Sequence, residues 1–143
     1  MKSQEIKIYR EIQRNTQMAM KAIDAISDKV HNEELTDHIN QQSLEYSKIH
    51  NEALENLLSS KAPPYQGSRV EDMMLKSGIR YNTMLNTSTS HIAELMIKGS
   101  NTGIVEMSKV LNRNEDAGLK STSLAHQLLD CEQKSIDTLK KYL

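Results

Sequence analysis

The stretch from Ser68 to Asn112 constrains the fold most, because it has the residue spacing of one long helix. Ser68 and Glu71 form an S-x-x-E capping box, which satisfies free amides at a helix start. The following residues recur in alternating steps of four and three, the spacing of a helix face that packs against other helices. They are Val70, Met74, Ser77, Tyr81, Met84, Ser88, His91 and Leu95. The pattern predicts an all-α protein.

Two segments could interrupt this long helix. Residues 86–90 (NTSTS) have poor helix propensity, but the apolar spacing continues across them, so we expect them to be helical. Gly99 and Gly103 each cost about 1 kcal/mol in a helix interior. The sequence therefore predicts a kink near Gly99–Gly103. The alternative is a close contact between two helices at these small residues.

Three more helices are predicted, at about Ser3–Lys29, at about Glu33–Leu58, and from just after Asn114 to the C-terminus. Pro63 and Pro64 end any helix between the second and third. Short corners favour antiparallel neighbours. We expect one domain over residues 1–143, an antiparallel four-helix bundle in up-down-up-down order.

Composition limits the classes of partner. The formal net charge is −1 with mixed signs, so no basic surface is expected for nucleic acid. No apolar run approaches the roughly 18 residues of a membrane-spanning helix, and the charged N-terminus lacks a signal-peptide core. Cys131 is the one cysteine and has no partner for an internal disulfide. We expect a cytoplasmic protein with no membrane partner.

Polar side chains stand on helix faces where a bundle ordinarily places Leu or Ile. Those predicted to face inward are Thr16, Gln42, Ser77, Ser88 and His91. If the chain turns at Asn112 or Arg113 and the last two helices pack antiparallel, His91 lies opposite about residue 133. An inward Glu132 would then face it.

A metal or ligand site could form around this pair. Asp24 and His38 fall near the same level, and Glu94 is one helical turn from His91. First-row metals accept imidazole and carboxylate ligands together, which makes Fe, Mn or Zn the candidate ions. A structural pair, with His91 hydrogen-bonded to Glu132 in the core, is the alternative.

Histidine and acidic residues inside a short helical bundle resemble the ferritin-like family. Members carry Glu-x-x-His on two of their helices. This chain has no Glu-x-x-His and shows the reverse order, His91-x-x-Glu94. The stretch STSHIAELMIKGSNTG is also similar to uncharacterised small helical proteins of clostridial type. The resemblance implies a bundle with an internal His/Glu site.

Two functions remain open at this point. The chain has no phosphate-binding loop, no CxxC pair and no nucleophile motif, so we expect a non-catalytic structural or interaction protein without a cofactor. An unbroken Ser68–Asn112 helix would extend beyond the first two helices, which points to Ile104–Leu124 as a homo-oligomer contact. The alternative is a ferritin-like protein that binds a metal or small ligand through His91 and Glu132.

Overall fold

The structure is a computed structural model that describes residues 1–143 except for the side chains of Met84 and Leu85. In the part of the chain described, it contains five α-helices and no strand, which confirms the all-α class. The α-helices are α1 (Ser3–Ile26), α2 (Glu33–Ser59), α3 (Arg69–Leu85), α4 (Thr89–Arg113) and α5 (Leu119–Leu139). Short 3-10 turns follow α1 at Ser27–Lys29 and α5 at Lys140–Tyr142.

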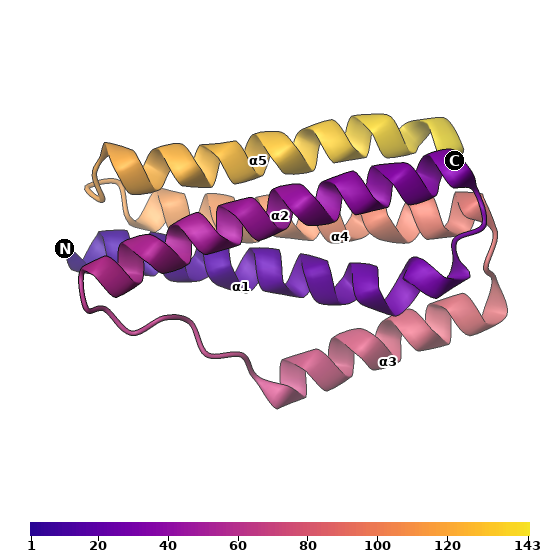
Figure 1. Ribbon diagram of the computed structural model, residues 1–143, viewed down its shortest axis with the longest axis horizontal. Helices are drawn as coiled ribbons and strands as arrows, with labels where there is room; N and C mark the ends of the chain where they lie inside the picture. Colours follow the sequence, from indigo (N-terminus) through magenta and orange to yellow (C-terminus); the bar gives the residue numbers. More distant parts are fainter.

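Four long helices, α1, α2, α4 and α5, lie side by side (Figure 1). Helix α3 lies outside this group and packs along α1. Helix α1 contacts α2 and α4, and α5 contacts the same two helices from the other side. Each helix runs antiparallel to these neighbours, so α2 and α4 run in the same direction. In chain order α1, α2, α4 and α5 therefore run up, down, down and up, which differs from the predicted up-down-up-down order because α3 is a separate helix between α2 and α4. Residues 60–88, which include α3, return along the length of the molecule before α4 begins.

The predicted long helix is two helices, and the break lies at residues 86–88 instead of at the glycines. The Asn86 side-chain Oδ1 accepts a hydrogen bond from Ser88 N at 2.9 Å. The Ser88 hydroxyl accepts one from His91 N at 3.2 Å and caps α4. These side-chain oxygens satisfy backbone amides that a continuous helix would otherwise have to pair.

Helix α4 continues through Gly99 and Gly103 without a break, and the two glycines have different surroundings. At Gly103 the neighbouring helix α1 is so close that an added Cβ would lie 2.8 Å from Asn15 Oδ1. Asn15 Nδ2 also donates to the Gly103 carbonyl at 2.9 Å. A Cβ at Gly99 would meet nothing within 4 Å. Of the two glycines, the close helix contact therefore occurs at Gly103, and α4 is not interrupted at either of them.

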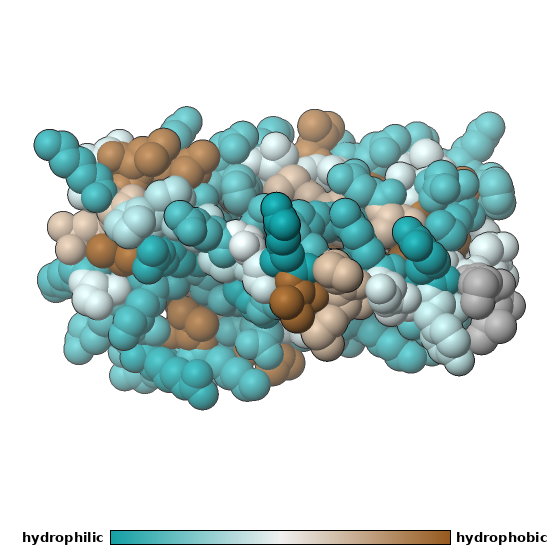
Figure 2. Space-filling model, turned by 90° about the horizontal axis from the view of Figure 1, so that it is seen from below, coloured by the Kyte–Doolittle hydropathy of each residue, from teal (hydrophilic) through white to brown (hydrophobic). Residues whose placement is uncertain are grey.

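The regular stripe that begins at Val70 does not face the core. Val70, Met74 and Tyr81 are 66%, 71% and 64% exposed, and Ser77 is exposed as well. The side chain of Met84 lies outside the described residues. Helix α3 instead packs on α1 through its opposite side. Figure 2 looks onto α3 and shows hydrophobic residues scattered among hydrophilic ones on its outer surface.

The predicted protruding hairpin at Ile104–Leu124 is also absent from the described structure. Because the break at residues 86–88 shortens it, α4 has 25 residues, close to the 24 of α1 and 27 of α2. Met107 and Leu124 lie in the core. The backbone amide of Asp116 between α4 and α5 donates to Gln4 on α1 at 2.9 Å.

Among the described residues, no helix combines the length and the apolarity that crossing a membrane requires.

Candidate functional site: a cavity between α1, α3 and α4

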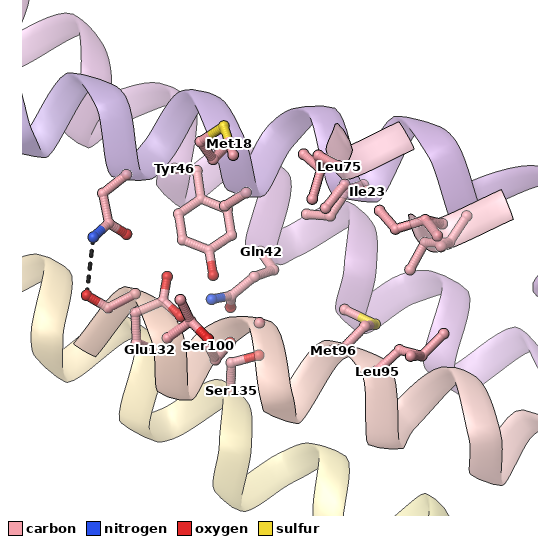
Figure 3. Close-up of a pocket in the computed structure, with 18 of the residues that line it drawn as sticks. Met18, Ile23, Gln42, Tyr46, Leu75, Leu95, Met96, Ser100, Glu132 and Ser135 are labelled. Carbon is pink, nitrogen blue, oxygen red and sulfur yellow. Dashed lines mark hydrogen bonds between the residues drawn. The ribbon is translucent and has the colours of Figure 1, made fainter. Parts of the chain in front are cut away.

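A cavity of about 320 Å³ lies between α1, α3 and α4, and side chains of α2 and α5 form its inner wall. Figure 3 shows that its two ends differ in chemistry. Tyr46, Gln42, Ser100, Glu132 and Ser135 gather at one end. Ile23, Leu75, Leu95 and Met96 line the other. We call these the polar end and the apolar end.

Small residues on the facing sides of α1 and α4 leave the space for this cavity. Ala19 and Ala22 line it from α1, and Gly99 lines it from α4. The helices touch at Gly103, but no atom lies within 4 Å of a Cβ built on Gly99, one turn away. Leu75 and Ile79 of α3 form the remaining wall. The small residues of α1 and α4 therefore leave this space between the two helices, and α3 covers it.

Glu132 of α5 is the central residue of the polar end. It is 2% exposed, and its carboxyl carbon lies 3.6 Å from the Cβ position of Gly103. Burial raises the pKa of Glu132, while the nearby hydroxyls of Tyr46 and Ser100 lower it by less. Its Oε2 atom has no hydrogen-bond partner among the described residues. A buried carboxylate oxygen without a partner is costly, so this atom is suited to a proton or a ligand donor.

Two side chains near Glu132, Gln42 and Ser135, form hydrogen bonds with residues outside the cavity lining. The Gln42 amide nitrogen donates to Cys131 O at 3.4 Å and to Cys131 Sγ at 3.3 Å. The Ser135 hydroxyl lies 3.0 Å from His38 Nε2. Burial lowers the pKa of His38, which keeps its imidazole neutral at pH 7. Tyr46 has its pKa raised by burial first and by Glu132 second, so its phenol stays protonated.

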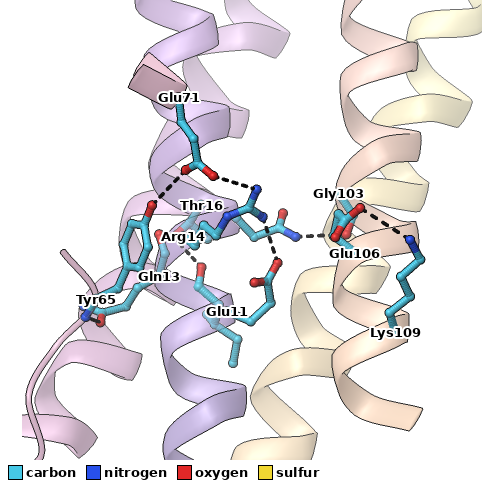
Figure 4. Close-up of polar contacts among 11 residues, drawn as sticks. Glu11, Gln13, Arg14, Thr16, Tyr65, Glu71, Gly103, Glu106 and Lys109 are labelled. Carbon is cyan, nitrogen blue, oxygen red and sulfur yellow. Dashed lines mark hydrogen bonds and ion pairs between the residues drawn. The ribbon is translucent and has the colours of Figure 1, made fainter. Parts of the chain in front are cut away.

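Charged residues stand where α1, α3 and the connector before α3 meet (Figure 4). Arg14 lines the cavity, and its guanidinium lies 3.3 Å from Glu11 and 3.6 Å from Glu71. The Tyr65 hydroxyl donates to Glu71 at 3.2 Å. Lys21 of α1 and Asp72 of α3 form a further ion pair. The Arg14–Glu71 and Lys21–Asp72 pairs join α1 to α3 and hold α3 over the cavity, each with a modest free energy of about 1 kcal/mol or less.

The predicted pairing of His91 with Glu132 is wrong. His91 lies at the start of α4, where its Nε2 is 3.1 Å from Asn82 O and its Nδ1 is 3.7 Å from Glu94. The loop at residues 114–118 moves the fold-back point, so that Ser100 and not His91 faces Glu132. His91 is nine residues from Ser100, or about 13 Å along the helix. Glu94 is exposed and pairs mainly with Lys98 at 3.0 Å.

The other predicted site residues are also dispersed. Asp24 is exposed on α1, and His38 contacts the site only through Ser135. Thr16 is buried, but its hydroxyl binds the Ile12 carbonyl at 2.8 Å and His50 Nδ1 at 3.0 Å. Of the residues predicted to face inward, Gln42 and Glu132 belong to the cavity. No group of three or more His, Cys, Asp or Glu side chains converges among the described residues.

Sequence reasoning missed Ser100 and Asn15, which line the polar part of the cavity. The available signal was the pair Gly99 and Gly103, because small residues one turn apart mark a face that another helix or a ligand can approach. Ser100 follows the first glycine directly.

The sequence matches no protein-family model, no curated protein and no solved structure in comparisons with each.

Proposed function

We propose that this protein binds a small, elongated and mainly apolar molecule in the cavity between α1, α3 and α4. At about 320 Å³ the cavity is at the lower end of the size range of small-molecule sites. Its lining combines an apolar end with a few convergent polar groups, as ligand sites commonly do.

The observation that carries this proposal is the free Oε2 atom of Glu132. A structural carboxylate in a closed core would be expected to have all of its hydrogen-bonding capacity used. Glu132 is one of the residues that line the space covered by α3, and its unpaired oxygen is itself buried. A bound molecule would supply the missing donor and fill the space.

The experiment is a calorimetric and thermal-shift titration with linear alcohols from butanol to decanol. We expect affinity to increase with chain length until the cavity is full and then to fall. Ligand that binds only the folded state raises the melting temperature in proportion to ln(1 + [L]/Kd).

A variant that fills the cavity provides the decisive comparison. Gly99→Leu places a side chain where no atom lies within 4 Å and should abolish alcohol binding. Gly78→Leu is the matched control, because Gly78 is also helical with open space around it but does not line the cavity. Equal alcohol binding by the two variants, or none by the wild type, would contradict the proposal.

We also propose that α1, α2, α4 and α5 form a four-helix bundle of ferritin-like arrangement, with α3 in the crossover between α2 and α4. The parallel direction of α2 and α4 supports this reading. The converging ligands that a di-iron centre requires are not brought together among the described side chains, so the metal-binding form of the proposal loses its support.

A second candidate function is an interaction through the outer face of α3. Val70, Met73, Met74 and Tyr81 are all more than 60% exposed and follow a helical repeat. If the chain self-associates, this face is favoured over Ile104–Leu124. Sedimentation velocity tests the idea: Met74→Glu should reduce association, whereas Leu119→Glu, at an exposed apolar residue outside α3, should not.

A further inference from the structure

The polar end of the cavity presents mainly hydrogen-bond acceptors. Glu132 contributes an oxygen without a partner. Gln42 donates through its amide nitrogen to Cys131, which leaves its carbonyl oxygen to accept. The hydroxyls of Tyr46 and Ser100 lie near the Glu132 carboxyl, and each hydroxyl can accept a hydrogen bond as well as donate one.

No protein cation neutralises this end among the described residues. Arg14 is the one basic residue in the cavity lining, and its guanidinium is paired with Glu11 and Glu71. His38 lies behind Ser135 and contacts its hydroxyl instead of the carboxyl of Glu132. A ligand with both positive charge and several donors would therefore complement the polar end.

We infer that the cavity binds a primary amine with a hydrocarbon body, with its ammonium group at Glu132 and its hydrocarbon among Ile23, Leu75 and Met96. This inference rests on the proposed function, since it names the chemical class of the ligand of the same cavity. An ammonium group has three donors, which suit the Glu132 carboxylate and the neighbouring acceptors.

Three ligands of equal length test the inference: n-hexylamine, n-hexanol and n-hexanoate, titrated by calorimetry at pH 7 into the full chain. The expected order is amine, then alcohol, with no measurable binding of the carboxylate. A hydrogen bond to a charged group supports an amine preference over alcohol of about tenfold or more.

Glu132→Gln keeps the shape of the side chain and removes its charge. It should bring hexylamine affinity down to near that of hexanol, whereas hexanol, which donates one hydrogen bond and carries no charge, should lose much less affinity. Glu94→Gln is the matched control, because Glu94 is an exposed carboxylate on α4 and outside the cavity. This control should retain the amine preference.

The outcomes separate the inference from the proposed function. Equal binding of hexylamine and hexanol by the wild type, stronger binding of hexanoate, or a preference that survives Glu132→Gln would overturn the amine assignment while the cavity function stands. Binding of none of the three would remove both. Because the wild-type comparison needs no substitution, a folding defect in Glu132→Gln would not leave the inference untested.

Discussion

Replacing Gly103 by alanine should destabilise the protein, although the same change elsewhere in a helix usually stabilises it. Alanine removes the helix penalty of glycine and should contribute about 1 kcal/mol of stability. At Gly103, however, the new Cβ would lie 2.8 Å from Asn15 Oδ1, a separation at which an atom must move.

The cost follows from what holds Asn15 in place. Its Nδ2 atom donates to the Gly103 carbonyl at 2.9 Å, and the residue is 6% exposed. Rotation away from the Cβ would break this bond and leave a buried amide unsatisfied, at about 1–3 kcal/mol. The net effect of Gly103→Ala should therefore be a loss of about 1 kcal/mol, the difference between these two terms.

Gly99→Ala is the matched control, one turn earlier on α4. No atom lies within 4 Å of its Cβ position, so the gain of about 1 kcal/mol should appear in full. The two variants should differ by about 2 kcal/mol in urea unfolding and by roughly 6 °C in melting temperature.

A double variant identifies the contact responsible. In an Asn15→Ala background the obstacle at Gly103 is gone, so adding Gly103→Ala should stabilise the chain as Gly99→Ala does. Equal stabilisation by Gly103→Ala and Gly99→Ala in the wild-type background would refute the close approach of α1 and α4.

Three further results are expected. Ser88→Ala should cost about 1 kcal/mol of stability because it removes the α4 cap, whereas Thr87→Ala, its neighbour in the break, should cost less in the same urea unfolding assay. The Cys131 thiol should react slowly with a disulfide reagent at pH 7 in the folded protein and quickly in urea, because burial raises its pKa to about 11. The free-energy changes of His91→Leu and Glu132→Leu should add within about 0.5 kcal/mol in a double-mutant cycle, since the two side chains do not meet. A coupling above that limit would restore the pairing expected from the sequence.

Much of the secondary structure could be predicted from the sequence because its determinants are local. The α1 and α2 ranges follow from their apolar spacing, and the connector follows from Pro63 and Pro64. The Ser68 cap is present, with its hydroxyl accepting from Glu71 N at 3.3 Å. Poor helix propensity at residues 86–90 indicates the break, whereas the heptad spacing that continues across them favours one helix. That spacing is a true feature of α3, although its regular face is exposed.

The candidate site depends on which residues of two neighbouring helices lie opposite each other. Local sequence patterns do not determine this alignment. A shift of the fold-back point from Asn112 to the loop at residues 114–118 replaced His91 by Ser100 opposite Glu132. Each residue of shift moves the facing position by two residues, so small errors at a corner separate side chains by several turns. The sequence by itself determined that the chain is helical, where most helices begin, and that Glu132 lies inside. Only the tertiary structure decided that α3 covers a cavity with Glu132 in its wall, because that space depends on the contact of α1 with Gly103 and its absence at Gly99.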